Sequence, residues 1–319
     1  MNNDFFATPI EDSPANPPQN LNQQKKPLGY DQLIVNFTDN LKANNLPAVH
    51  LFEAPLGSGK RCLSEYLAAE LLGTTSSQYS ELSLHPDLLI IDHQLESGVK
   101  KEISIATTRK IKDFLQLTAA QSNNKVVIID CLDKLNHAAA NSILKILEEP
   151  PANCYFLLVC HNSANILATI NSRCQKITLP RLSKIDIQTI LQEHALAEDL
   201  EILYELFPYQ PGEILRFHEN EGLNLLKKFS ELVEAQDKAA LKAAISALDF
   251  SKKPELFGNF QVIFHHIIYQ QIKEDLDKAQ LISELHNFLN DFYDLFAKTQ
   301  KLNLDKKNFL INSFFNLMK

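Results

Sequence analysis

Residues 125–174 give the strongest indication of the fold in this sequence. They contain two apolar runs, residues 126–129 and 155–160, in which hydrophobic and polar residues do not alternate. Such runs are typical of strands that are buried on both faces of a parallel sheet. Between them the sequence predicts a helix that begins after Asn136 and ends before two prolines. Asp130 follows the first strand, at the edge where open α/β sheets place their chemistry.

The composition is that of a globular protein with two or three domains. The chain has 319 residues, of which 45% are hydrophobic and 22% are charged, and its net charge is −8. This charge excludes a bulk basic surface for nucleic acid and leaves room only for a local patch. Neither an apolar run of 18 residues nor a secretory signal is visible, so we expect a cytoplasmic protein with no membrane partner. The five cysteines form no CxxC pair and are expected to be reduced core residues.

The pattern changes along the chain and predicts four regions. Residues 1–28 are rich in Asn, Pro and Gln and are expected to form a disordered tail. Residues 29–180 contain five predicted strands with helices between them, and residues 181–223 contain short predicted helices. Residues 224–319 show only the three- and four-residue apolar spacing of helices. We therefore expect an α/β domain with a parallel five-stranded sheet, a small helical region and an all-α C-terminal domain.

A strand, a glycine loop and a helix are predicted in succession between residues 48 and 72. A phosphate loop needs this context, because backbone N–H groups would surround phosphates and Lys60 would reach the outer ones. Gly57 and Gly59 keep the loop pattern, but its first glycine is replaced and Arg61 stands where Ser or Thr is usual. That hydroxyl normally holds Mg²⁺, which a guanidinium would repel. We therefore favour a vestigial loop, in which Lys60 has a structural partner, over a working one.

Three motifs together resemble the clamp-loader subunits of bacterial DNA polymerase III, which are AAA+ ATPases. They are the apolar strand that ends at Asp130, the sequence NSILKILEEP at residues 141–150, and the Ser-Arg-Cys sequence centred on Arg173. The resemblance covers residues 30–219. It implies an AAA+ P-loop NTPase-type (RecA-like) domain that is followed by a helical lid. It also implies that the C-terminal helices form a collar, which joins other subunits in a ring.

The resemblance assigns a specific role to Arg173. In this family, the arginine of the Ser-Arg-Cys motif crosses a subunit interface and reaches the γ-phosphate of ATP bound by the adjacent subunit. The planar, permanently charged fork of arginine suits this arginine-finger role. The alternative is a salt bridge within the chain. Glu148 and Glu149 oppose the dipole of their predicted helix, so we expect at least one of them to accept from a cation in this chain or in a neighbour.

Compared with a working ATPase of this family, the chain departs at three positions. Arg61 replaces the Mg²⁺-binding hydroxyl, and Cys131 replaces the glutamate that would polarise the attacking water after Asp130. The second phosphate-sensing arginine would fall near Gly212 and is absent there. Asp130 is then either a residual metal ligand or a salt-bridge partner. Asn162 could sense a phosphate, but a hydrogen bond at the strand end is the favoured interpretation.

These features predict a non-hydrolysing AAA+ subunit that completes the loader ring, contributes Arg173 and helps to load a sliding clamp onto primed DNA during replication. The implied partners are the tau/gamma ATPase subunits, the delta subunit and, through the complex, the clamp and the primer–template DNA. No cofactor and no metal are expected. The loop departures speak against ATP binding, and residues 72–85 lack the four-cysteine zinc module of many family members.

Two readings of the enzymatic role stay open. In the first, the chain is part of the DNA-directed DNA polymerase holoenzyme without ATPase activity of its own. In the alternative, it is a catalytically active ATPase of the tau/gamma type, with Gly57, Gly59, Lys60 and Asp130 in a working pocket.

Overall fold

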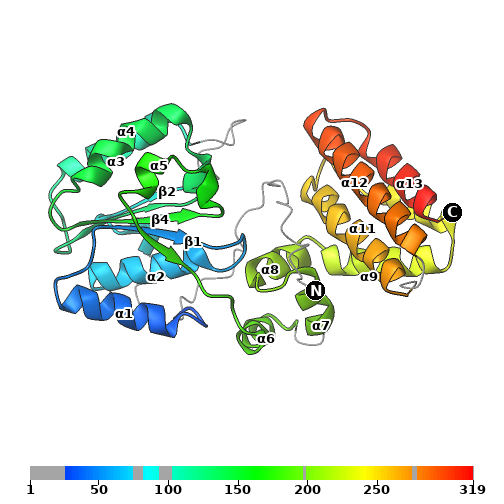
Figure 1. Ribbon diagram of the computed structural model, residues 1–319, viewed down its shortest axis with the longest axis horizontal. Coiled ribbons are helices and arrows are strands. Elements are labelled where there is room, and N and C mark those ends of the chain that lie inside the picture. Colours follow the sequence, from blue (N-terminus) through cyan, green and yellow to red (C-terminus); the bar gives the residue numbers. More distant parts are fainter. Residues whose placement is uncertain (1–25, 75–81, 93–102, 197–198, 275–278, 319) are drawn as a thin grey trace. The chain divides into compact units, whose positions relative to one another are not determined.

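The computed structural model describes residues 26–74, 82–92, 103–196, 199–274 and 279–318 (Figure 1). The described residues form two compact units, which divide between Ile214 and Leu215. Most of the tail that the sequence predicts, up to residue 25, lies outside the described residues, as does much of the segment examined for a zinc module. The predicted domain borders at residues 180 and 223 stay predictions.

The first unit is built on one parallel sheet of five strands in the order β2-β3-β4-β1-β5. In chain order, the strands are β1 (Val49–Glu53), β2 (Leu88–Ile91), β3 (Lys125–Ile129), β4 (Cys154–Cys160) and β5 (Gln175–Thr178). Every neighbouring pair is parallel. The sequence prediction of a parallel five-stranded sheet is confirmed. The two runs that predicted it, β3 and β4, are paired neighbours in the middle of the sheet.

Helices lie on both faces of the sheet, with α1 and α2 on one side and α3, α4 and α5 on the other (Figure 1). Their bounds are α1 (Asp31–Lys42), α2 (Lys60–Leu72), α3 (Ile105–Gln116), α4 (His137–Glu148) and α5 (Ala168–Asn171). Three short helices follow β5, namely α6 (Lys184–Glu193), α7 (Leu200–Leu206) and α8 (Pro211–Glu219). The Asn136 side chain caps α4 by accepting from the Ala139 backbone N–H at 2.9 Å, which confirms the predicted cap.

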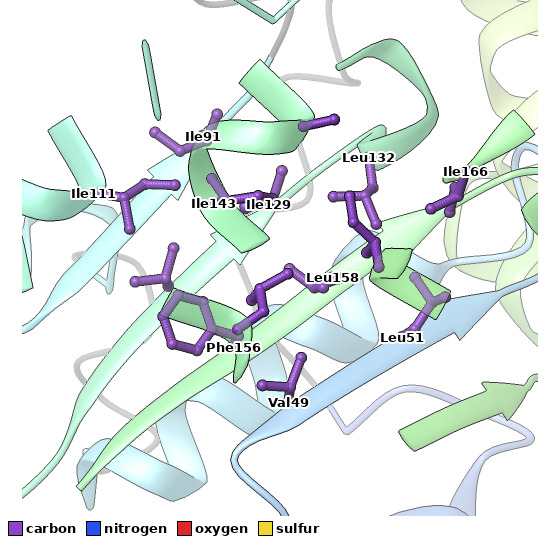
Figure 2. Packing of buried hydrophobic residues seen from close by; sticks show 14 of the residues in the cluster. Val49, Leu51, Ile91, Ile111, Ile129, Leu132, Ile143, Phe156, Leu158 and Ile166 are labelled. Carbon is purple, nitrogen blue, oxygen red and sulfur yellow. The ribbon is translucent and has the colours of Figure 1, made fainter. Parts of the chain in front are cut away.

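The main core of this unit lies between the sheet and the α3–α4 side (Figure 2). Alternate residues of β1, β3 and β4 reach it, because successive side chains of a strand point to opposite faces. Members include Val49, Leu51, Ile129, Phe156 and Leu158, all at most 5% exposed. Burying each side chain of this size contributes about 1.5–3 kcal/mol. The core fixes the strand register and, with it, the positions of the groups at the strand ends.

The second unit consists of helices. They are α9 (Gly222–Glu234), α10 (Lys238–Ala247), α11 (Glu255–Glu274), α12 (Ala279–Lys301) and α13 (Lys306–Leu317). Phenylalanines form much of its core, as the apolar spacing predicts. The rings of Phe264 and Phe292 stack at 3.9 Å between centroids, and those of Phe257 and Phe296 at 4.4 Å. In the described part of the chain, no helix combines the length and apolar character needed to span a bilayer.

His50 makes the first unit sensitive to acid. Its ring lies in β1 between Phe37 and Phe52, and burial lowers its pKa to about 4 from an ordinary value of 6.5. Below pH 6.5 the unfolded chain therefore takes up a proton that the folded chain accepts only near pH 4. The free energy of unfolding should fall by about 2.5 kcal/mol between pH 7.5 and pH 4.5 on account of this residue. Urea unfolding followed by circular dichroism measures this change.

The variant His50→Leu should lose this share of the pH dependence. The exposed His137, at the start of α4, supplies the control, since His137→Gln should keep the parent's pH dependence. An equal acid effect in His50→Leu and the parent chain would contradict the assignment.

Candidate functional site

The candidate site lies at the carboxyl edge of the sheet. Strand β4 pairs with both β3 and β1, so the groups at the ends of these three strands are neighbours. Glu53 ends β1, Asp130 follows β3, and Asp92 follows the adjacent β2. The glycine loop joins β1 to α2 at this same edge. The strand order therefore places the glycine loop and Asp130, both predicted from the sequence, at the same edge of the sheet.

The loop has the backbone shape that its glycines allow. Gly57 and Gly59 have φ angles of 73° and 89°, in the left-handed region that other residues rarely adopt. The Tyr30 hydroxyl donates to the Ser58 carbonyl at 2.5 Å and holds the loop against the start of α1. Lys60 is the first residue of α2, as the motif requires.

Lys60 is bound to its own loop. Its side chain is buried, with 3% exposed, and its Nζ donates to the carbonyls of Ala54 and Pro55 at 2.6 Å each. Burial lowers the pKa of Lys60 to about 8, against the opposing effect of nearby acids such as Asp130. The amine thus has the internal partners that the vestigial interpretation of the loop predicts.

Arg61 stands among three carboxylates. Its Nε is 2.6 Å from Oε1 of Glu65, and its Nη1 is 3.2 Å from Oδ2 of Asp92 and 3.0 Å from Oδ2 of Asp130. Burial lowers the pKa of Arg61, but the nearby carboxylates raise it by more. The pKa of Arg61 therefore lies above its ordinary value. The guanidinium therefore lies where the acids of a working site would hold a cation, and Asp130 is a salt-bridge partner.

The start of α8 lies directly on the glycine loop. The Gly212 N–H donates to the Gly57 carbonyl at 2.8 Å, and a Cβ added to Gly57 would lie 2.6 Å from the Glu213 nitrogen. The Glu213 side chain is 4% exposed, and its Oε1 would be 3.2 Å from that same Cβ. Glycine at position 57 permits this close approach. The start of α8 therefore packs against the loop without space for a side chain at position 57.

Cys131 occupies the position after the strand-end acid in a left-handed conformation, with φ of 59°. Its Sγ is 3.5 Å from His161 Nε2 and 3.8 Å from Asp130 Oδ1. Asp133 accepts from the His161 backbone N–H at 3.4 Å. The thiol is buried beside these groups. All five cysteines are free, as the sequence predicts.

Asn162 makes a local hydrogen bond after β4. Its Oδ1 accepts from the Ala164 N–H at 2.9 Å and caps a short turn of 3₁₀ helix. The neighbouring Ser163 N–H donates to Glu53 Oε1 at 2.8 Å, and Lys176 approaches Glu53 at 2.6 Å. Burial raises the pKa of Glu53, but its hydrogen bonds with Lys176 and Ser163 lower it by more. The pKa of Glu53 is therefore below its ordinary value. The strand-end hydrogen bond favoured for Asn162 is confirmed.

Arg173 follows α5. Its side chain contacts Thr169 and Glu148 and not the glycine loop or the acids around Arg61. Its Nη1 donates to the Thr169 carbonyl at 2.8 Å, and its Nη2 is 3.2 Å from Glu148 Oε1. The Arg173 and Glu148 side chains are 29% and 57% exposed, so the pair lies at the surface. The expectation that Glu148 or Glu149 accepts from a cation is confirmed for Glu148. The finger role of Arg173 stays a prediction.

Several acids of the site escaped the sequence prediction, among them Glu65, Asp92 and Glu213. Glu65 lies one helical turn after Arg61, and this spacing alone could have indicated the pair. Asp92 follows β2 as Asp130 follows β3, so the strand-end pattern could have indicated it too. Glu213 gave no signal, because only the folding of α8 onto the loop brings it near Gly57.

A family model described as "DNA polymerase III, delta subunit" matches residues 29–183. A DNA polymerase III subunit delta' of Pseudomonas aeruginosa is 29% identical over 62% of this chain and 62% of its own length. The subunit delta' of Haemophilus influenzae is 32% identical over 56% of this chain and 55% of its own length. The chain thus matches under two thirds of the length of these two relatives.

A solved structure shares the fold. It is a DNA polymerase III gamma subunit-related protein from Thermotoga maritima, with a TM-score of 0.50 and 18% identity. The superposition covers 89% of this chain and 100% of that one. Together with the strand order, this similarity shows that the first unit has the AAA+ α/β fold.

Proposed function

We propose, from the match of residues 29–183 to the family model and from the similarity to two delta' subunits, that the chain belongs to the delta-prime-type clamp-loader family of DNA polymerase III and is the non-hydrolysing delta prime subunit of a bacterial clamp loader. It completes the loader ring in the cytoplasm and contributes Arg173 to a neighbouring ATPase subunit. In this way it helps to place the sliding clamp on primed DNA during replication.

The position of Arg61 carries the non-hydrolysing part of this proposal. A site for Mg·ATP needs a hydroxyl and an acid that hold the cation beside the phosphates. Here the guanidinium of Arg61 lies within 3.0 Å of Asp130, and the acid already has its positive partner. A divalent ion at that point would face a permanent positive charge. The residues present therefore do not fit Mg·ATP.

Two further observations support the same conclusion. The Lys60 amine donates to two carbonyls of its own loop, and the buried Glu213 lies against Gly57. The Lys60 amine would have to leave both carbonyls before it could reach a phosphate. Cys131 stands in place of the glutamate that would polarise the attacking water, and a buried thiol is a poor base at neutral pH.

Arg173 is proposed as the trans arginine finger. Its guanidinium lies at the surface in a loop after α5, outside this chain's own glycine-loop network. A terminal nitrogen of an exposed guanidinium can donate a hydrogen bond to a phosphate that another subunit holds. The proposed partners are the tau/gamma-type ATPase subunits and the delta subunit, with the clamp and primer–template DNA bound through the complex.

The purified chain is expected to show no ATP hydrolysis in the presence of Mg²⁺, because the cation position is taken by Arg61. Phosphate release measured at millimolar ATP checks this expectation. Turnover that disappears in Lys60→Ala would instead favour the alternative, an active ATPase of the tau/gamma type. Co-purification from a bacterial lysate with clamp-loader subunits tests the assembly role, and failure to associate with them would contradict it.

A further inference from the structure

We propose that Glu148 is a positioning residue, which holds the guanidinium of Arg173 in the orientation that it needs as a finger. This inference rests on the proposed role of Arg173 and extends it to a second residue. Glu148 ends α4, whereas Arg173 follows α5. The two helices pack against each other, so the contact joins two elements of the first unit.

Two acceptors from different helices fix the fork of Arg173. The Thr169 carbonyl of α5 accepts from Nη1 at 2.8 Å, and Oε1 of Glu148 is 3.2 Å from Nη2. With a single acceptor, the guanidinium could rotate about that one hydrogen bond. Two acceptors on the two terminal nitrogens define its plane. The position of the fork is therefore set before any phosphate is present, which is what electrostatic catalysis requires.

The fork keeps donors for an external acceptor. A guanidinium carries five N–H groups, of which these two contacts use two. Nε is buried and has no hydrogen-bond partner in the described part of the chain, so it faces the protein. Each terminal nitrogen retains a second N–H, and 29% of the side chain is exposed. A phosphate oxygen of a neighbouring subunit could thus bind without displacing Glu148.

Folding stability does not account for Glu148. It lies at the carboxyl end of α4, where a negative charge opposes the helix dipole. Its ion pair is 57% exposed on the acid side, and exposed pairs contribute little to stability. Glu149 carries the same charge one residue later, but the ion pair with Arg173 is made by Glu148. The contact between Glu148 and Arg173 is instead explained by a role in orienting the Arg173 guanidinium.

The test is a reconstituted clamp loader in which only the ATPase site that faces this chain can hydrolyse ATP. Glu148→Gln should lower kcat about tenfold and leave KM for ATP unchanged, because Arg173 acts on the transition state. The matched control Glu149→Gln removes the same charge at the same helix end and should keep kcat at the parent value. Gel filtration and thermal unfolding verify that each variant still folds and assembles.

A double variant separates positioning from a general structural effect. If Glu148 acts through Arg173, adding Glu148→Gln to Arg173→Ala should cause no further loss of kcat. Additive losses, or equal losses in Glu148→Gln and Glu149→Gln, would overturn the positioning role. If Arg173→Ala itself leaves kcat unchanged, the proposed finger function fails. If only Glu148→Gln leaves kcat unchanged, the finger stands and the positioning role is wrong.

Discussion

Replacing Arg173 with alanine should lower the clamp- and DNA-stimulated ATP hydrolysis at the facing site by about 10³-fold or more. The loss follows from removing a permanent charge that stabilises the transition state of phosphoryl transfer. The chain itself should remain folded, because the ion pair of Arg173 with Glu148 is exposed and contributes little to stability. Single-turnover hydrolysis in a reconstituted loader with one competent site measures the effect.

Arg173→Lys provides the matched comparison for this prediction. Lysine keeps the charge but has a single nitrogen, so it cannot reproduce the contacts that Nη1 and Nη2 make with Thr169 and Glu148. We expect it to recover only a small part of the lost rate. Hydrolysis at the parent rate in Arg173→Ala would remove Arg173 from the mechanism, whatever the behaviour of the lysine variant.

Replacing Arg61 with alanine should destabilise the first unit by about 3 kcal/mol at neutral pH. Glu65, Asp92 and Asp130 would then lie close together at the sheet edge without the cation that now contacts all three. Their side chains are 23%, 10% and 16% exposed, so water compensates only in part for the lost charge. Urea unfolding at low ionic strength measures the loss of stability.

The same variant should also acquire an affinity for divalent ions. Three carboxylates without a resident cation resemble the oxygen ligands that Mg²⁺ prefers, so millimolar Mg²⁺ should restore part of the lost stability. Arg109→Ala, which removes an exposed arginine from α3, should change the free energy of unfolding by less than about 0.5 kcal/mol. An Arg61→Ala variant as stable as Arg109→Ala would show that the carboxylate cluster does not depend on Arg61.

Local patterns in the sequence were sufficient to predict the elements of the fold. Four consecutive β-branched residues make up most of β3, and the Asn136 cap marks the start of α4. Such signals depend on burial periodicity and on hydrogen bonds between residues that are close in the chain. The glycine loop before Lys60 was recognisable for the same reason. The departure at Arg61 led to the prediction that the loop holds no metal ion, which stays a prediction.

The parallel sheet, most of its helices and the chemical types of the residues at the strand ends could thus be predicted from the residues alone. The partners of those residues became known only from the fold. Arg61 contacts both Asp92 and Asp130 because β2 and β3 are neighbours in the sheet. Glu213 lies against Gly57 because the start of α8 packs on the glycine loop. For Arg173, the sequence left a salt bridge and a finger open. The structure supplied Glu148 as its partner, since ion pairs between distant segments depend on packing and not on local pattern.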